Sequence, residues 1–251
     1  RAEKWMNRVK DKPFAMYLSH KGVHAEFKPA KRHEGKYKDL PVMSPQSMYL
    51  TVTDSSKHYG VITPPKTTVN YKDIPKWVRE QRYSWHGVDY MYHGQIPFDK
   101  FYHLYLETLQ AVDESVQSVL NWVEENGLKE NTMVVYMGDN GFLFGEHGLI
   151  DKSNAYEESM RVPMLVWAPG MVKPGSVFSQ MILNIDMAPT FLEIAGIEKP
   201  AQMQGQSFLP LLKGENIAWR DKVYYEYYWE QAFPQTPTTY AIRSDKFKYI
   251  A

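Results

Sequence analysis

Residues 132–170, TMVVYMGDNGFLFGEHGLIDKSNAYEESMRVPMLVWAPG, decide the fold of this chain. The stretch contains two apolar runs of strand length, at residues 132–137 and 164–167, and we expect both to form strands. Four glycines and many short polar residues lie between them, and such residues permit tight turns. The stretch therefore predicts two strands joined by a connection that carries polar, chemically active side chains.

Helical patterns flank this stretch on both sides. Upstream, apolar side chains recur at spacings of three and four over residues 105–123, which predicts an amphipathic helix that Gly127 can end in a left-handed conformation. Downstream, residues 186–195 predict a second helix, followed by Gly196. Strands that alternate with helices favour an α/β fold with a largely parallel sheet. Further strands are expected at residues 14–18, 223–228 and 247–250.

The segment between the first strand and the long helix is different in character. Residues 25–100 show little periodicity and contain many prolines, and their centre, residues 31–98, reads as a loop-rich insertion. A loop-rich segment of this length within a compact chain more often has a function than not. We found no internal repeat.

Composition excludes several classes of function. The chain has 29 basic and 29 acidic residues, which favours neither a nucleic-acid nor a membrane-surface partner. No apolar run approaches the roughly 20 residues of a membrane span. The chain has no cysteine, so disulfides and thiolate metal sites are excluded for this stretch. It also has no N-x-[ST] acceptor, which favours a bacterial source. The first residues are no signal peptide, and both ends read as cuts through a longer protein.

Candidate metal ligands follow the strand at residues 132–137. Asp139 and Asn140 offer adjacent carboxylate and amide oxygens, which are hard ligands suited to Ca²⁺ or Mg²⁺. Gly138 and Gly141 flank them and allow a close approach of the backbone to an ion. The alternative is an ordinary Asn-Gly turn without a metal. Two side chains cannot complete a coordination sphere, so further ligands must come from elsewhere.

Candidate groups for an anion and for proton transfer lie nearby in the expected fold, because ligands of α/β sheets gather at the carboxyl ends of the strands. Lys152 can return to the same strand end and bind an anionic oxygen; the alternative is an exposed lysine. His24, which follows the strand at residues 14–18, is a candidate general acid. His20 is its rival for that role, and a structural role is open for both.

Three segments together resemble the sulfatase family of the alkaline-phosphatase superfamily. They are PFAMYLSHKGVHAEFKPAKRH at residues 13–33, GDNGFLFGEHGLIDKSNAYEESMRVPMLVWAPG at residues 138–170, and MILNIDMAPTFLEIAGIEKPAQMQGQSFLPLLKG at residues 181–214. The resemblance implies an alkaline-phosphatase-like α/β sandwich with a mostly parallel central sheet. It implies a catalytic-domain part at residues 1–215 and the start of a small C-terminal antiparallel subdomain at residues 216–251.

The resemblance also assigns roles to single residues. It implies that Asp139 and Asn140 bind calcium, that Lys152 contacts the sulfate and stabilises the departing oxygen, and that His24 protonates the leaving alcohol. His20 is then a structural neighbour. Glu157 and Arg161 match a Y-E-x-x-x-R-V-P pattern, in which we expect an ion pair or support for a helix.

The family's nucleophile is missing from this sequence. In the family, a Cys or Ser within C/S-x-P-S-R becomes formylglycine, and acidic metal ligands lie near it; neither feature occurs here. We expect both upstream of this chain, so that the whole protein hydrolyses sulfate esters and this stretch alone does not. The rival hypotheses are a phosphodiesterase or phosphonate hydrolase of the same superfamily, and a non-catalytic relative that binds sulfated glycans.

The expected substrate is a sulfated saccharide. The region of residues 75–100 and the GEHGL segment are similar to sulfatases that act on glucosamine 6-sulfates and other glycosaminoglycan units. His86 and His93 are candidates to line a sugar pocket, although a structural role is equally open. The expected location of the whole protein is periplasmic or secreted. The sequence gives no indication of oligomeric state.

Overall fold

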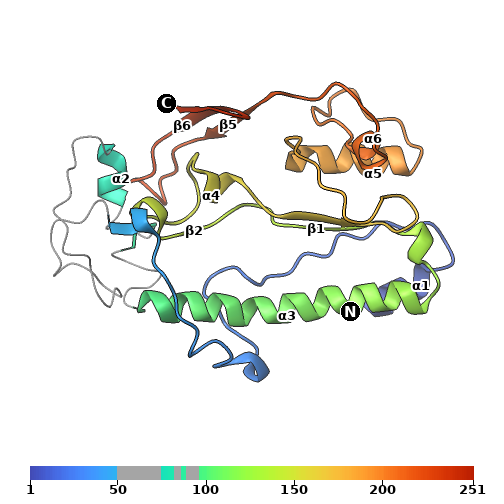
Figure 1. Ribbon diagram of the computed structural model, residues 1–251, viewed down its shortest axis with the longest axis horizontal. Helices are drawn as coiled ribbons and strands as arrows, with labels where there is room; N and C mark the ends of the chain where they lie inside the picture. Colours follow the sequence, from blue (N-terminus) through green and yellow to red (C-terminus); the bar gives the residue numbers. More distant parts are fainter. Residues whose placement is uncertain (50–74, 82–85, 89–95) are drawn as a thin grey trace. The chain divides into compact units, whose positions relative to one another are not determined.

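The computed structural model describes residues 1–49, 75–81, 86–88 and 96–251. They divide into two compact units (Figure 1). Unit 1 comprises Arg1–Asn126, Phe142–Ser153 and Trp229–Pro237, and unit 2 comprises Gly127–Gly141, Asn154–Tyr228 and Thr238–Ala251. The boundary at residue 215 that the resemblance implies stays a prediction. None of the helices within the described residues has the length and apolar character required to cross a membrane.

The helices of the described residues are short, with one exception, α3. They are α1 (Ala2–Val9), α2 (Lys76–Gln81), α3 (Phe98–Glu125), α4 (Glu157–Met160), α5 (Met187–Ile194) and α6 (Leu209–Leu212). Short 3-10 helices cover Lys31–His33, Gln46–Tyr49, Lys129–Asn131, Glu146–Gly148 and Asn184–Asp186. The strands are β1 (Val134–Met137), β2 (Leu143–Phe144), β3 (Ile150–Asp151), β4 (Met164–Trp167), β5 (Lys222–Tyr227), β6 (Thr239–Ser244) and β7 (Lys248–Ile250).

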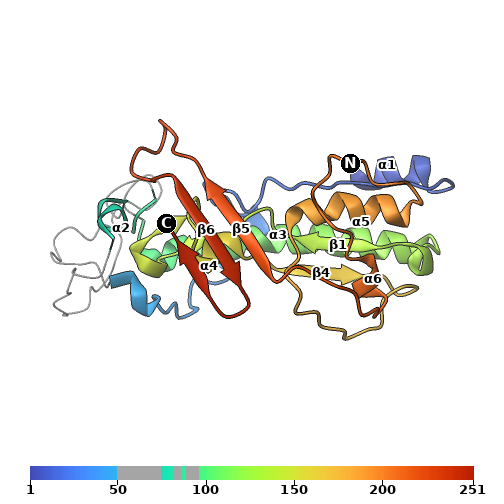
Figure 2. The same cartoon turned by 90° about the horizontal axis from the view of Figure 1, so that it is seen from above.

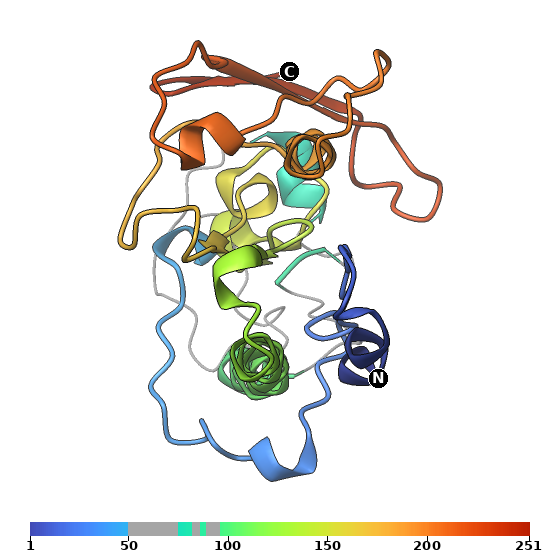
Figure 3. The same ribbon diagram turned by 90° about the vertical axis from the view of Figure 1, so that its right-hand side faces the viewer.

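Unit 1 is organised by α3. The predicted helix is confirmed, but it begins at Phe98, directly after Pro97, and so extends further upstream than the periodicity indicated. Gly127 has a φ of 70°, the left-handed conformation expected after the helix end. The N-terminal helix α1 lies beside α3 (Figure 3), and the Trp122 indole donates a 2.9 Å hydrogen bond to Asn7 Oδ1. This contact ties the N-terminal segment to the long helix.

The apolar core of unit 1 joins segments that are distant in the sequence. Its buried side chains come from the residues upstream of α3, from the start of α3 and from the β2–β3 hairpin. They are Phe27, Met48, Val88, Phe98, Phe101 and Ile150. Burial of large apolar and aromatic side chains is the main source of stability in such a cluster, at roughly 1.5–3 kcal/mol per side chain. The core therefore fixes the base of the hairpin that carries Lys152.

Unit 2 contains two antiparallel sheets (Figure 2). Strands β1 and β4 pair with Val134 opposite Trp167 and Met137 opposite Met164. Strands β5, β6 and β7 form a second sheet in chain order. The strand at residues 164–167 is confirmed without a shift, and those at 132–137, 223–228 and 247–250 with shifts of one or two residues at their ends; β6 was not predicted from sequence.

The expected parallel arrangement is not present among the described residues. All strand pairs there are antiparallel, and residues 14–18 form no strand with any described segment. An apolar run becomes a strand only where a neighbour exchanges backbone hydrogen bonds with it. Phe14 instead packs its ring against Trp5 and Trp122 in unit 1. The apolar pattern alone does not identify such neighbours, which explains this error.

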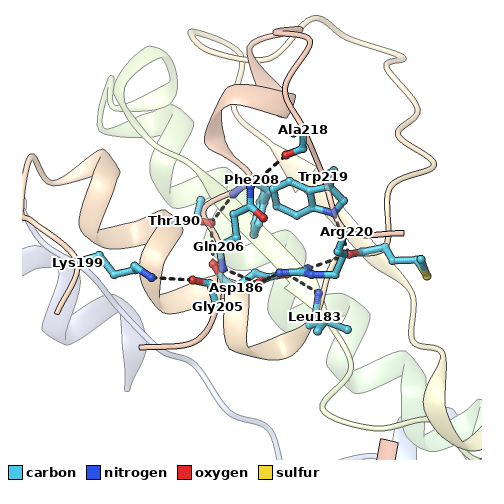
Figure 4. Close-up of polar contacts among 11 residues, drawn as sticks. Leu183, Asp186, Thr190, Lys199, Gly205, Gln206, Phe208, Ala218, Trp219 and Arg220 are labelled. Carbon is cyan, nitrogen blue, oxygen red and sulfur yellow. Dashed lines mark hydrogen bonds and ion pairs between the residues drawn. The ribbon is translucent and has the colours of Figure 1, made fainter. Parts of the chain in front are cut away.

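Asp186 connects the loops of unit 2 around α5 (Figure 4). Its side chain is fully buried and accepts hydrogen bonds from the backbone N–H groups of Leu183, at 2.7 Å, and Gln206, at 2.8 Å. Arg220 binds both carboxylate oxygens. The Thr190 hydroxyl donates to the Asp186 carbonyl at 2.7 Å. Beside this network lie the buried core residues Leu211 and Leu212 of α6 and Phe208, which directly precedes that helix.

Candidate active site

The segment that carries Lys152 is a tight hairpin in unit 1. Strand β2 pairs with β3, with Leu143 opposite Asp151 and Phe144 opposite Ile150. Glycines at 145 and 148 have φ values of 102° and 76°, which only glycine adopts at little cost. The GEHG segment therefore forms a compact turn, and Lys152 follows directly after strand β3.

Lys152 is held by the residue before it. Its Nζ donates a hydrogen bond of 2.9 Å to Oδ1 of Asp151, whose side chain is only 10% exposed. The Lys152 side chain as a whole is 30% exposed. An ammonium has three donors. One is therefore used to fix its direction, and the others can bind an anionic oxygen.

The backbone on both sides of Lys152 adopts an uncommon conformation. Asp151 has a φ of 79° and Ser153 a φ of 74°, although neither is glycine. Residues held in the left-handed region cost of order 1–3 kcal/mol each and cluster at functional sites. The surrounding structure therefore holds the backbone on both sides of Lys152 in a strained conformation.

Asp151 is also bound by His86. The Nε2 of His86 lies 3.3 Å from Asp151 Oδ2, and both side chains are buried. Burial alone raises the pKa of the Asp151 carboxyl, but hydrogen bonds from His86 and Lys152 and the charge of Lys152 outweigh it and lower this pKa to about 2. The carboxylate is therefore ionised throughout the neutral range. The sequence left two roles open for His86, on the rim of a sugar pocket or in the structure; its side chain is buried inside unit 1, which favours the structural role.

His24 lies in a separate open pocket of unit 1, of about 550 Å³. The pocket is lined by Lys21, Gly22, His24, Ala25, Glu26, Lys28 and Thr108. The Nδ1 of His24 lies 2.6 Å from the carbonyl oxygen of Ala25, which can only accept. Nδ1 therefore carries a proton, and the proton that the ring can give to or take from a ligand is the one on Nε2.

His20 is engaged elsewhere in unit 1. Its Nε2 lies 2.8 Å from the hydroxyl of Ser115 on α3. This contact agrees with the structural role that the resemblance implies for His20, and it leaves His24 as the stronger candidate for proton transfer. His93 lies outside the described residues.

Asp139 and Asn140 lie in unit 2, with one residue, Gly138, between them and the end of β1, and both are exposed. Asp139 Oδ1 accepts from the Asn140 backbone N–H at 3.0 Å, and the Asn140 amide donates to the Gly141 carbonyl at 2.7 Å. The turn leaves the other Asp139 oxygen and the Asn140 amide oxygen available to a cation. A hard cation fits this donor set. It is incomplete, since no group of three or more His, Asp or Glu in the described part of the chain could hold a metal.

Two contacts in unit 2 shape this turn, and sequence reasoning missed both. The Asn184 side-chain amide donates a 2.7 Å hydrogen bond to the Asp139 carbonyl. A Cβ at Gly141 would meet the Glu158 carbonyl oxygen at 2.0 Å, so glycine is required there for packing against α4. The close approach of this backbone to an ion, for which Gly138 and Gly141 were expected, stays a prediction; the close neighbour of Gly141 in the structure is the Glu158 backbone.

Glu157 supports the fold of unit 2 through partners other than the expected one. Its carboxylate binds Arg243, at 3.0 Å, and Lys248. The link to Arg161 is a backbone hydrogen bond of 2.7 Å to the Glu157 carbonyl at the end of α4. Of the two expected roles, helix support is therefore correct, and an ion pair with Arg161 is not what the carboxylate forms.

The four principal candidates are divided between the units. His24 and Lys152 belong to unit 1, and Asp139 and Asn140 belong to unit 2. Their convergence on one site stays a prediction. Within each unit the structure adds supporting residues to which sequence reasoning gave no role: Asp151 at Lys152, Thr236 at His86, and Asn184 at Asp139.

Comparison with known families gives two matches that cover the chain. The sulfatase family model matches residues 1–197, and the model for the C-terminal part of N-sulphoglucosamine sulphohydrolase matches residues 145–251. A curated N-acetylglucosamine-6-O-sulfatase of Bacteroides thetaiotaomicron is 32% identical over 97% of this chain and 50% of its own length. The chain thus spans about half the length of that relative.

Solved structures confirm the α/β fold class. A protein solved with its substrate D-glucosamine-2-N,6-O-disulfate is similar over 99% of this chain and 58% of its own, with 30% identity and a TM-score of 0.77. A phosphonate monoester hydrolase from Silicibacter pomeroyi is similar over 61% of this chain and 33% of its own, with 27% identity and a TM-score of 0.55. The alkaline-phosphatase-like fold implied by the resemblance is therefore confirmed.

Proposed function

This chain belongs to the sulfatase family, and from that membership we propose that the whole protein hydrolyses sulfate esters of a glycosaminoglycan-type saccharide. One observation carries the proposal. Lys152 follows a tight hairpin and is flanked by two residues with positive φ. The buried carboxylate of Asp151 binds its ammonium and fixes its direction. Such a preorganised cation stabilises charge that develops on an anion during reaction.

Lys152 acts on the sulfate group in this proposal. Attack of the nucleophile on sulfur breaks the bond between sulfur and the sugar oxygen, and negative charge grows on that departing oxygen. The free N–H groups of Lys152 donate to the oxygens that gain charge. A charge-assisted hydrogen bond of this kind contributes about 1.5–3 kcal/mol.

His24 supplies the proton in this proposal. With Nδ1 held by the Ala25 carbonyl, the protonated ring presents Nε2–H, and this proton passes to the departing alkoxide to give the free sugar hydroxyl. The ring returns to the neutral form, with Nδ1–H still bound to the carbonyl. The exposed position of His24 in an open pocket leaves room for a saccharide.

Asp139 and Asn140 would hold Ca²⁺ through the oxygens that the turn leaves available. When bound, the ion polarises a sulfate oxygen and lowers the pKa of the nucleophile. Within this chain, Asn184 holds the carbonyl of Asp139 and so orients the turn. The nucleophile and the remaining ligands are expected in other parts of the whole protein.

The finer specificity that we propose is for a 6-sulfated glucosamine unit. It is supported by the 30% identity, over nearly the whole chain, to a protein solved with a glucosamine disulfate. We place the whole protein in the periplasm or outside the cell, where such polysaccharides are encountered.

Sulfate release tests the proposal directly. The whole protein is incubated with glucosamine 6-sulfate, and free sulfate is measured by ion chromatography for the wild type, Lys152→Ala and the matched control Lys173→Ala. Lys173 is an exposed lysine of unit 2. We expect Lys152→Ala to lower kcat by about 10²–10³-fold and Lys173→Ala to leave it unchanged. Undiminished turnover by Lys152→Ala would refute the role of this residue.

Two outcomes would favour the rival functions. Faster hydrolysis of a phosphonate monoester than of any sulfate ester would identify the activity of the second solved relative. Saturable binding of a sulfated glycan without release of sulfate would identify a non-catalytic binding protein. Both assays use the same protein preparation, so a folding defect is recognised by loss of all signals.

A further inference from the structure

A chain of buried polar side chains leads from the interior of unit 1 to Lys152. Its members are Gln81, Thr236, His86 and Asp151, and their exposed fractions are 0%, 1%, 4% and 7%. They come from four segments of the sequence, yet each lies within hydrogen-bonding distance of the next. Buried polar groups are costly unless they are paired, so a connected set of this kind is a specific structural feature.

The direction of each hydrogen bond follows from the chemistry of the groups. Gln81 Nε2 donates to Thr236 Oγ1 at 3.1 Å. The Thr236 hydroxyl, 3.3 Å from His86 Nδ1, can then donate to that nitrogen in the neutral ring. A carboxylate only accepts, so His86 Nε2–H donates to Asp151 Oδ2. Lys152 donates to the other oxygen of Asp151.

The backbone brings His86 to this position. The Ile150 N–H donates to the His86 carbonyl at 2.7 Å, and the Val88 N–H donates to the Gly148 carbonyl at 3.2 Å. Residues 86–88 are thereby attached to the β2–β3 hairpin. The ring of Phe233 packs against the His86 ring, with 4.6 Å between the two ring centroids. Both carboxylate oxygens of Asp151 are thus occupied, and its rotation is restricted.

We propose that His86 and Asp151 are positioning residues that fix the direction in which the Lys152 ammonium meets its anion. This proposal rests on the proposed function, in which Lys152 binds the sulfate. Asp151 acts on Lys152 directly, and His86 acts through Asp151. Neither is expected to touch the saccharide, since both side chains are buried.

Two variants of His86 distinguish its hydrogen bond to Asp151 from its packing in the interior of unit 1. The side-chain amide of His86→Gln can place an N–H near the position of Nε2, whereas His86→Leu fills the space without a donor. We expect His86→Gln to keep kcat within about threefold of the wild type and His86→Leu to lower it about tenfold or more, with KM changed much less. The matched control is His103→Leu, because His103 is also buried in unit 1 but bonds the Leu40 carbonyl. Its kcat per folded molecule should not change.

A double-mutant cycle tests whether Asp151 acts through Lys152. Asp151→Asn should lower kcat when Lys152 is present and should have no further effect in Lys152→Ala, because the group that it positions is gone. An equal loss of kcat in both backgrounds would show damage to the hairpin in general and would overturn the proposal. Equal kcat for His86→Gln and His86→Leu would overturn it too.

A second readout does not depend on sulfatase activity. Acetylation of Lys152 by acetic anhydride is followed by mass spectrometry and normalised to that of Lys173. We expect acetylation of Lys152 to be about tenfold faster in Asp151→Asn and His86→Leu than in the wild type, since the amine is then released from its partner. Unchanged acetylation would refute the positioning role. If the wild type releases no sulfate, the proposed function fails, and the acetylation rates still decide the network.

Discussion

The side-chain amide of Asn184 donates a 2.7 Å hydrogen bond to the backbone carbonyl of Asp139, a residue 45 positions earlier in the chain. The bond joins the 3-10 helix Asn184–Asp186 to the turn after β1, within unit 2. Residues that hold a ligand without touching the metal typically affect its affinity by 10–100-fold. We therefore expect Asn184 to support the candidate calcium site, a role that sequence reasoning did not assign to it.

We expect Asn184→Ala to weaken calcium binding about tenfold and Asp139→Ala to weaken it further. Asn184→Ala frees the Asp139 carbonyl and lets the turn move, while Asp139→Ala removes a carboxylate that would bind the ion. Thermal denaturation of the whole protein at increasing Ca²⁺ concentration measures the affinity without any assay of activity. Asn121→Ala, at an exposed position on α3, should leave the calcium response unchanged. A calcium response equal in all four proteins would exclude Asp139 as a ligand.

We expect the loss of kcat in His24→Ala to increase with the basicity of the leaving group, because a more basic leaving group depends more on protonation by His24. For a sugar sulfate the departing alkoxide is strongly basic, so His24→Ala should lower kcat by about 10²–10⁴-fold. For 4-nitrophenyl sulfate, whose leaving group needs little protonation, the loss should be much smaller. Measurement of kcat for both substrates with wild type and His24→Ala gives the ratio. His20→Ala is the comparison, because His20 is bound to Ser115, and its effect should be similar for both substrates. An equal loss for both substrates in His24→Ala would contradict a role as general acid.

Local sequence patterns correctly predicted those helices and strands of this fold that have a clear apolar pattern. The helix up to residue 125, β1, β4 and α5 occur where apolar spacing and capping glycines placed them. The strand predicted at residues 14–18 is wrong because an apolar run does not specify which segment pairs with it. Strand β6 was missed for a related reason, since it is defined by pairing with β5 and β7.

The candidate site was predictable only where a motif marks it. Asp139, Asn140, Lys152 and His24 stand in segments with a family resemblance. Their supporting contacts carry no such mark: Thr236 contacts His86, 150 positions away, and Asn184, although it lies in the third resembling segment, contacts Asp139, 45 positions away. Contacts of this kind depend on the tertiary fold, and single-sequence reasoning gives no access to them. His86 illustrates the limit, because the sequence suggested chemistry there but not its buried position.

The pKa of Asp151 predicts a pH-dependent contribution to stability. The folded-state pKa of about 2 lies below the ordinary value of 3.8, so the ionised carboxylate stabilises the fold at pH values above about 4. This contribution, about 2 kcal/mol, is lost as the pH falls from about 4 towards 2. Urea unfolding of the wild type and Asp151→Asn should therefore give free energies whose difference shrinks over this interval. Other carboxyls titrate in both proteins and cancel in the difference. A difference that is constant with pH would contradict the assignment.

The buried pair of Asp186 and Arg220 should dominate the stability of unit 2. Asp186→Ala removes the partner of a guanidinium that is only 17% exposed and leaves the N–H groups of Leu183 and Gln206 without their acceptor. Loss of one member of a buried pair costs about 3–5 kcal/mol. Asp221→Ala is the matched control, because Asp221 meets Lys222 at 3.8 Å on the surface, where an ion pair contributes about 0–1 kcal/mol. Urea unfolding followed by far-ultraviolet circular dichroism measures both. A cost for Asp186→Ala as small as that for Asp221→Ala would show that the loops around α5 are held by apolar packing and not by this pair.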